Sequence, residues 1–244
     1  MRNFTVLILL VTLFSQTSIQ GQNIKQNEFL YTLTAMVNSD SLAQTIQDLE
    51  AFVSRHSYNP NHAQVAPYIR ERLENYGCEI EIDTFPYTIS SSGITTEQYN
   101  VIGKIYGNTD NPPILIGAHH DSCCRIDSSP GADDNASGTA AVIEAARVFS
   151  QSGHIPRRTV YFCTWAAEEQ GLNGSKNFAR KLRQNGINLE LAINLDMIAN
   201  NDLNYFRVVM ESSAEITSQA LDFAALNENL SIILGESTGN SDHA

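Results

Sequence analysis

Imidazole and carboxylate side chains follow three short apolar segments of this 244-residue chain, at residues 114–118, 159–165 and 191–195. Six such side chains come after these segments: His119, His120, Asp121, Glu168, Glu169 and Asp196. If the segments are neighbouring strands of an open α/β sheet, their carboxyl ends meet at one edge, where ligands collect. Histidine nitrogen and carboxylate oxygen are common zinc ligands. The sequence therefore predicts a metal site at that edge.

The segment 130–138, Pro-Gly-Ala-Asp-Asp-Asn-Ala-Ser-Gly, adds two carboxylates, Asp133 and Asp134, beside the expected start of a helix. A single Asp or Ser there would serve as a helix cap. A histidine after a strand, or paired glutamates at a helix start, also has an ordinary structural explanation when taken alone. The joint occurrence of these residues at adjacent strand ends favours a functional site instead.

Four stretches of the chain have the apolar spacing of amphipathic helices. The first begins at Asp40, a capping residue type, and continues to residue 53. The second covers residues 65–77 and is expected to stop near its final glycine. The other two lie at residues 137–150 and 175–184, between the apolar segments.

The three apolar segments are rich in β-branched or aromatic residues, which is typical of strands buried on both faces. Before them, apolar and acidic residues alternate over residues 78–83, and this predicts a strand whose acidic side, with Asp83, faces water. A second strand is expected over residues 99–106. Near the C-terminus, strands are expected at 206–210 and 232–234, with a helix over 216–226 between them.

Alternating strands and helices imply parallel strands with helices on both faces of the sheet. The predicted fold class is α/β, with a mostly parallel mixed central sheet. No internal repeat or linker interrupts the sequence, so a single domain is expected over residues 22–244.

The N-terminal residues 1–21 have the composition of a secretory signal peptide: Arg2, an apolar run over residues 4–14, then small and polar residues. The alternative is a retained N-terminal anchor. We therefore expect a secreted or periplasmic protein. The formal net charge of −12, without a basic patch, argues against nucleic acid and anionic membranes as partners.

Five short motifs occur in order along the chain, at residues 117–122, 130–138, 166–175, 194–197 and 241–243. Together they closely resemble the bacterial leucyl aminopeptidase family, whose members are co-catalytic di-zinc exopeptidases related to glutamate carboxypeptidase and the glutaminyl cyclases. The resemblance extends from about residue 40 to the last residue. It implies a zinc exopeptidase fold, of the phosphorylase/hydrolase-like type, and two Zn²⁺ ions per chain in the full-length protein.

The resemblance also implies a role for each matching residue. Four residues match the family's metal ligands: His119, Asp134, Glu169 and Asp196. Aligned on Ser137-Gly138, Asp134 rather than Asp133 matches the carboxylate that bridges both metals, and the family often has a cis peptide just before it. His120 would face away from the metals.

Two further residues match catalytic positions of the family. Glu168 matches the general base, and Asp121 matches the aspartate that orients the His119 imidazole. We expect Glu168 to take a proton from water and to pass it to the leaving amine.

The family pattern requires one more histidine ligand, well beyond the Ser-Asp-His motif. The sequence ends at Ala244, inside that motif, and His243 matches the motif's own histidine. We therefore expect this sequence to be a piece of a longer protein.

The function expected is that of an exported zinc aminopeptidase with peptide substrates, because carboxylates can also receive the ammonium group of a peptide N-terminus. Three alternatives stay open: a single-zinc glutaminyl cyclase-like acyltransferase, a carboxypeptidase of the same fold, and a metal-free binding module. The oligomeric state and the preferred N-terminal residue are not predicted.

Overall fold

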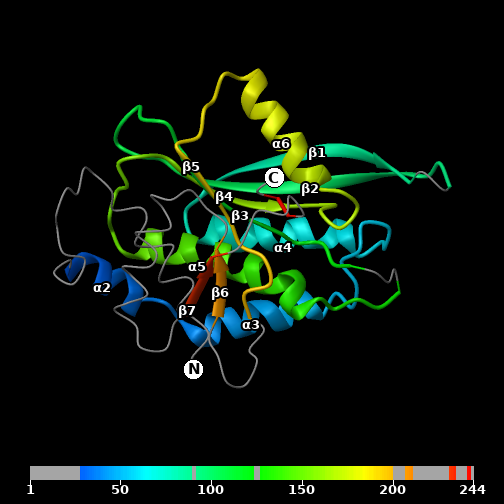
Figure 1. The fold of residues 1–244 in the computed structure, drawn as a ribbon, viewed down its shortest axis with the longest axis horizontal. Coiled ribbons are helices and arrows are strands. Elements are labelled where there is room, and N and C mark those ends of the chain that lie inside the picture. Colours follow the sequence, from blue (N-terminus) through cyan, green and yellow to red (C-terminus); the bar gives the residue numbers. More distant parts are fainter. Residues whose placement is uncertain are drawn as a thin grey trace.

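The computed structural model describes residues 28–89, 92–123, 127–199, 207–210, 231–234 and 241–242 (Figure 1). Within them, the helices are α2 (Glu28–Ala35), α3 (Ser39–Glu50), α4 (His62–Asn75), α5 (Gly138–Gln151) and α6 (Asn173–Gln184). The strands are β1 (Glu79–Thr88), β2 (Thr95–Ile105), β3 (Ile114–His119), β4 (Val160–Trp165), β5 (Leu191–Asn194), β6 (Arg207–Met210) and β7 (Ser231–Leu234).

The four predicted amphipathic helices are present as α3, α4, α5 and α6, with one change at the start of α3. The residue that caps α3 is Asn38 rather than Asp40, because the Asn38 side chain accepts hydrogen bonds from the backbone N–H groups of Asp40 and Ser41. An Asn side chain in this position satisfies N–H groups that have no partner inside the helix. Helix α4 stops just before Gly77, whose φ of +75° suits a residue without a β-carbon.

The five-stranded sheet has the strand order β1-β2-β4-β3-β5. Strand β3 pairs in parallel with both β4 and β5, whereas β2 pairs antiparallel with both β1 and β4. The expected mixed sheet is confirmed, and its parallel part consists of the three apolar segments recognised in the sequence. Parallel neighbours end at the same edge, so the residues after β3, β4 and β5 lie close together.

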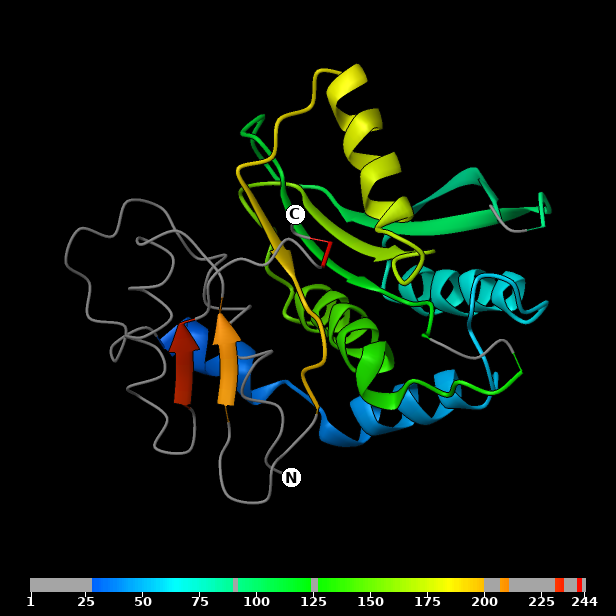
Figure 2. The ribbon, with the colours of Figure 1, turned by 45° about the vertical axis from the view of Figure 1, so that its right-hand side comes forward.

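Helices cover both faces of this sheet, as expected (Figure 2). On one face, α3, α4 and α5 form the larger apolar core, where Ile116 of β3 and Phe162 of β4 contact Val142 and its neighbours. On the other face, α6 contributes Phe178 and Leu182, which pack against the alternate side chains of the strands: Ile102, Leu115, Tyr161, Cys163 and Trp165. Strands covered on both faces explain the uninterrupted apolar segments in the sequence.

The prediction for strand β1 is wrong in one respect, since its acidic side does not simply face water. Asp83 is buried, with 5% of its surface exposed, whereas Ile82 on the opposite side is 36% exposed. The reason is that α6 lies over this part of the sheet, and Asn177 and Lys181 of α6 contact the Asp83 carboxylate. Alternation along a strand identifies its two sides, but packing decides which side is covered.

The two strands expected near the C-terminus are present as a parallel pair, β6 with β7. The helix expected over residues 216–226 and the signal peptide expected over residues 1–21 lie outside the described residues. Among the helices that the structure does describe, none combines the length and apolar character needed to span a bilayer.

Candidate metal centre

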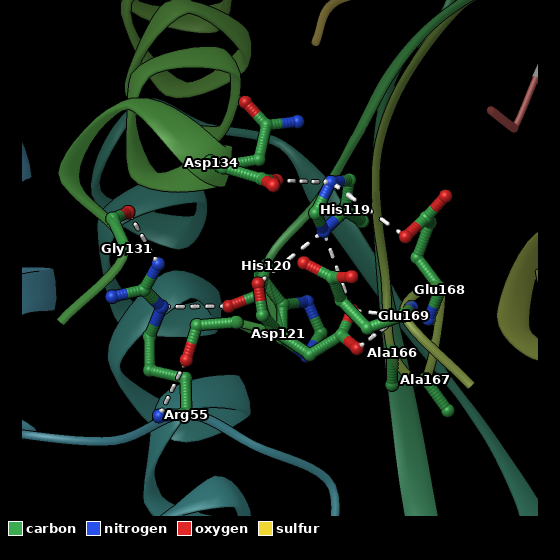
Figure 3. Close-up of polar contacts among 12 residues, drawn as sticks. Arg55, His119, His120, Asp121, Gly131, Asp134, Ala166, Ala167, Glu168 and Glu169 are labelled. Carbon is green, nitrogen blue, oxygen red and sulfur yellow. Dashed lines mark hydrogen bonds and ion pairs between the residues drawn. The ribbon is translucent and has the colours of Figure 1, made fainter. Parts of the chain in front are cut away.

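The predicted site residues all lie at the carboxyl edge of the parallel strands. His119 is the last residue of β3, Glu168 and Glu169 lie in the loop after β4, and Asp196 follows β5. Asp134 comes from the irregular turn Ala132–Ser137, which leads into α5. Three strand ends and one helix start therefore supply the side chains of one site. Figure 3 shows the residues from β3, from the loop after β4 and from the turn before α5.

The Nε2 atom of His119 is the centre of this arrangement. It lies 3.1 Å from Asp134 Oδ1, 3.4 Å from Asp196 Oδ1 and 3.9 Å from Glu168 Oε2. The imidazole is almost completely buried, with 1% of its side chain exposed. Three carboxylates thus face one ring nitrogen, an arrangement that a cation would stabilise strongly.

Two groups of ligand atoms can each hold a metal ion, and both include His119. The first group also contains Asp134 and Asp196, and the second contains Glu168 and Glu169. Within each group the ligand atoms lie within 4.8 Å of one another. The Oε1 atom of Glu169 is buried and has no hydrogen-bond partner among the described residues. The imidazole nitrogen and carboxylate oxygens of the two groups, including this Glu169 oxygen, are ligand types that bind zinc in proteins.

Asp121 connects the two sides of the site. Its Oδ1 lies 3.5 Å from His119 Nδ1, the ring nitrogen on the side away from Asp134 and Asp196. The same carboxylate accepts hydrogen bonds from the backbone N–H groups of Glu168, at 3.1 Å, and Glu169, at 3.2 Å. The sequence did not indicate this second contact, which ties the loop after β4 to the end of β3.

The crowding of carboxylates shifts the pKa values of the site. Burial raises the pKa of Glu168 to about 8 and that of Glu169 to about 7, with neighbouring carboxylates acting in the same direction and His119 opposing them. Burial alone would lower the pKa of His119, but hydrogen bonds to Asp121, Asp134 and Asp196 raise it well above its ordinary value. The protein therefore concentrates negative charge where only a proton or a cation can compensate it.

The two aspartates of the turn point in different directions. Asp134 faces His119, whereas Asp133 Oδ1 accepts a hydrogen bond from the backbone N–H of Ala199 at 2.9 Å. A cis peptide bond is present, but it follows Asp134 instead of preceding it, so the expected position was wrong by one bond. Gly131 begins the turn with φ +53°, and a β-carbon there would lie 2.3 Å from the Asp134 carbonyl oxygen.

His120 belongs to neither ligand group. Its ring Nδ1 lies 3.1 Å from the hydroxyl of Thr164 in β4. Burial lowers the pKa of His120 to about 3, so its ring is neutral at physiological pH. The orientation expected for this residue agrees with its contacts.

Arg55 is a component of the site that sequence reasoning missed. Its guanidinium is buried beneath the turn and donates hydrogen bonds to the carbonyl oxygens of His120 (2.8 Å) and Gly131 (2.9 Å) (Figure 3). It also donates to the carbonyl oxygens of Leu49 (3.1 Å) and Pro130. Burial lowers its pKa to about 10, which leaves it charged at neutral pH. Because it binds both the turn and the residue after His119, Arg55 joins the segments that carry Asp134 and Asp121.

Ser241 supports the fourth predicted ligand. Its hydroxyl donates to Asp196 Oδ2 at 2.6 Å and accepts from Asn194 Nδ2 at 2.8 Å. The Ser-Asp-His motif is therefore adjacent to the metal centre, although His243 itself lies outside the described residues.

The sequence model of peptidase family M28 matches residues 100–244, which is more than half of the chain. The chain belongs to peptidase family M28. This membership confirms the resemblance inferred from the five motifs, and it makes peptides the substrate class of the family.

Curated relatives of this M28 chain match about seven tenths of its length. Leupeptin-inactivating enzyme 1 of Streptomyces exfoliatus is 34% identical over 178 residues, covering 72% of this chain and 38% of that protein. The chain spans roughly two fifths of the length of the curated relatives it matches.

Two solved structures share the M28 fold with this chain. The LapA aminopeptidase of Legionella pneumophila has a TM-score of 0.75 at 24% identity, covering 94% of this chain and 63% of that one. A glutaminyl cyclase of Bacteroides thetaiotaomicron, bound to N-acetylhistamine, has a TM-score of 0.69 at 21% identity, covering 85% and 79%.

Proposed function

We propose that this M28 member is a zinc-dependent exopeptidase, and specifically an aminopeptidase that removes N-terminal residues from peptides. The observation that carries the proposal is the convergence of Asp134, Asp196 and Glu168 on the single ring nitrogen of His119. The names of relatives, which include leucine aminopeptidases of fungi, support the aminopeptidase assignment.

In this proposal, four residues would hold two zinc ions: His119, Asp134, Glu169 and Asp196. Zinc supplies a positive charge that lowers the pKa of water from about 16 to about 7 and polarises a carbonyl group. Asp121 keeps the His119 ring oriented through its Nδ1 side. Arg55 and Ser241 hold the segments of Asp134 and Asp196 in place.

Glu168 acts as the general base of the proposed reaction. It accepts the proton of the attacking water and delivers it to the amine that leaves the cleaved peptide bond. The hydrogen bonds from the Glu168 and Glu169 backbone to Asp121 fix the loop on which this carboxylate lies. The carboxylate-rich surroundings also suit the ammonium group of a free peptide N-terminus, and this favours an aminopeptidase.

The test compares an aminoacyl-nitroanilide with its N-acetylated analogue, before and after treatment of the protein with a chelator. We expect cleavage of the free amine only, loss of activity on chelation, and recovery when zinc is added. Metal analysis should give two zinc ions per chain. One zinc ion would favour the glutaminyl cyclase reaction, whose fold is also similar. A folded protein without bound zinc would favour a binding module, and cleavage of the acetylated analogue would contradict an aminopeptidase.

We also propose that the protein acts outside the cytoplasm, on the basis of the signal-peptide composition of residues 1–21. N-terminal sequencing of the protein from its native host checks this proposal. The expected result is a first residue between positions 19 and 23. A protein that retains Met1 would favour the retained N-terminal anchor instead, and recovery of the protein from the cytoplasmic fraction would contradict the proposal.

A further inference from the structure

The loop that carries Glu168 and Glu169 is closed at its base by a side chain from another strand. Asn100 of β2 is completely buried, and its Oδ1 accepts a hydrogen bond from the backbone N–H of Ala166 at 3.0 Å. Its Nδ2 donates to the carbonyl oxygen of Gly174 at 2.9 Å. Ala166 is the first residue after β4 and Gly174 lies in the first turn of α6, so Asn100 spans the two ends of the loop.

The loop ends also bind each other directly. The N–H of Gly174 donates to the carbonyl oxygen of Ala166 at 3.0 Å, which leaves the Ala166 N–H and the Gly174 carbonyl for Asn100. The packing is tight: a β-carbon at Gly174 would lie 2.4 Å from Asn100 Oδ1 and 2.4 Å from the Ala166 oxygen. Asn100 thus completes a ring of hydrogen bonds at the base of the loop.

Asp83 determines how the Asn100 amide is oriented. The two residues are opposite each other in the β1–β2 register, and Asn100 Nδ2 donates to Asp83 Oδ2 at 3.0 Å. A carboxylate oxygen accepts hydrogen bonds from charged or neutral donors, so the NH₂ group of Asn100 must face Asp83. The amide oxygen is then directed to Ala166. Asn177 Nδ2, at 2.9 Å, and Lys181 Nζ, at 3.5 Å, hold Asp83 itself.

We propose that Asn100 is a positioning residue for the reaction proposed above, and that Asp83 fixes its amide. Asn100 holds the base of the loop over residues 166–174, while Asp121 holds its tip through the backbone of Glu168 and Glu169. Only the expected effect of Asn100 on catalysis rests on the proposed function. We call the hydrogen bonds of Asn100 to Ala166, Gly174 and Asp83 the clamp, and these contacts exist without metal or substrate.

The first test measures the clamp in the metal-free protein by amide hydrogen exchange. In Asn100→Ala, we expect the Ala166 amide to exchange roughly tenfold or more faster, because both buried hydrogen bonds between Asn100 and the ends of the loop are lost. The matched control is Gln98→Ala, which also removes a buried amide from β2 but one that binds Ser57 and Thr96 instead of the loop. In the control, exchange at Ala166 should stay as in the wild type.

The second test measures the consequence for the site. Asn100→Ala should lower kcat roughly 10–100-fold, the usual cost of losing a residue that supports a metal site. A zinc titration should also show weaker binding of one of the two zinc ions. The reason is that Glu169 lies on the loop, whereas His119, Asp134 and Asp196 do not. Unchanged Ala166 exchange and unchanged kcat in folded Asn100→Ala would overturn the proposal.

Two variants of Asp83 keep the proposal testable even if Asn100→Ala does not fold. Asp83→Asn retains an oxygen that can accept from Asn100 and Asn177, so Ala166 exchange should stay near the wild-type rate. Asp83→Ala removes the acceptor, and exchange should increase. Equal exchange in the two variants would overturn the role of Asp83. If exchange at Ala166 increases as expected but the wild-type protein cleaves no peptide, the structural role of Asn100 is supported and the proposed function is wrong.

Discussion

Glu168→Gln is expected to lower kcat roughly 10²–10⁴-fold, the contribution usually made by a general base. The substitution keeps the size of the side chain and removes its ability to accept a proton at neutral pH. The backbone N–H of residue 168 can still donate to Asp121, so the loop should keep its position. Steady-state kinetics on a free aminoacyl-nitroanilide, together with metal analysis of the same preparation, measure both properties.

The metal content of Glu168→Gln separates two roles that the geometry allows. Glu168 and Glu169 both belong to one ligand group with His119, although only Glu169 has a buried oxygen without a partner among the described residues. We therefore expect Glu168→Gln to retain two zinc ions and Glu169→Gln to lose one. Loss of zinc from Glu168→Gln would show a metal ligand at this position, and near-normal activity would remove Glu168 from the mechanism.

Asp134→Asn is expected to have the second large effect, the loss of zinc from both positions. Asp134 Oδ1 lies 3.1 Å from His119 Nε2, and the resemblance to the leucyl aminopeptidase family implies that this carboxylate would help to hold both zinc ions. An amide offers only one oxygen and no negative charge. The loss of zinc affinity should exceed the roughly 10–100-fold cost of removing a residue that only supports a ligand. Zinc titration with a competing chelator measures it.

Asp133→Asn is the matched control for this substitution, since the two aspartates are neighbours in the same turn. Asp133 Oδ1 accepts from the Ala199 N–H, and an asparagine oxygen can accept the same bond. Zinc affinity should therefore be nearly unchanged, and the free energy of unfolding should fall by about 1 kcal/mol or less. If Asp133→Asn loses zinc and Asp134→Asn keeps it, the assignment of the two aspartates must be reversed.

The parallel part of the fold could be predicted because its signals are local. Residues 114–118, 159–165 and 191–195 are apolar without interruption, and this pattern arises when both faces of a strand are covered. A parallel pairing of these strands then brings His119, Glu168 and Asp196 to one edge. The antiparallel pairing of β2 with β4 was not predicted, because strand order depends on contacts between distant segments.

The supporting residues of the site could not be found in this way. Arg55 and Asn100 belong to no recognised motif. In the sequence, nothing distinguishes them from ordinary polar residues of a loop or a strand. Their importance comes from burial and from contacts 65 and 66 residues away along the chain, with His120 and Ala166 respectively. A buried guanidinium or amide must satisfy its hydrogen bonds, and only the folded chain shows which partners are available.

The sequence by itself determined the family, the α/β class and the identity of the residues that gather at the metal centre, since ligand types and strand ends are adjacent along the chain. The resemblance already favoured Asp134 over Asp133 as the ligand, and the tertiary structure gives the physical reason: Asp134 faces His119, whereas Asp133 binds the backbone N–H of Ala199. Only the tertiary structure decided that Asp83 is buried, since α6 covers a strand side that alternation alone assigned to water. Local pattern selects the elements, and packing between distant segments selects their partners.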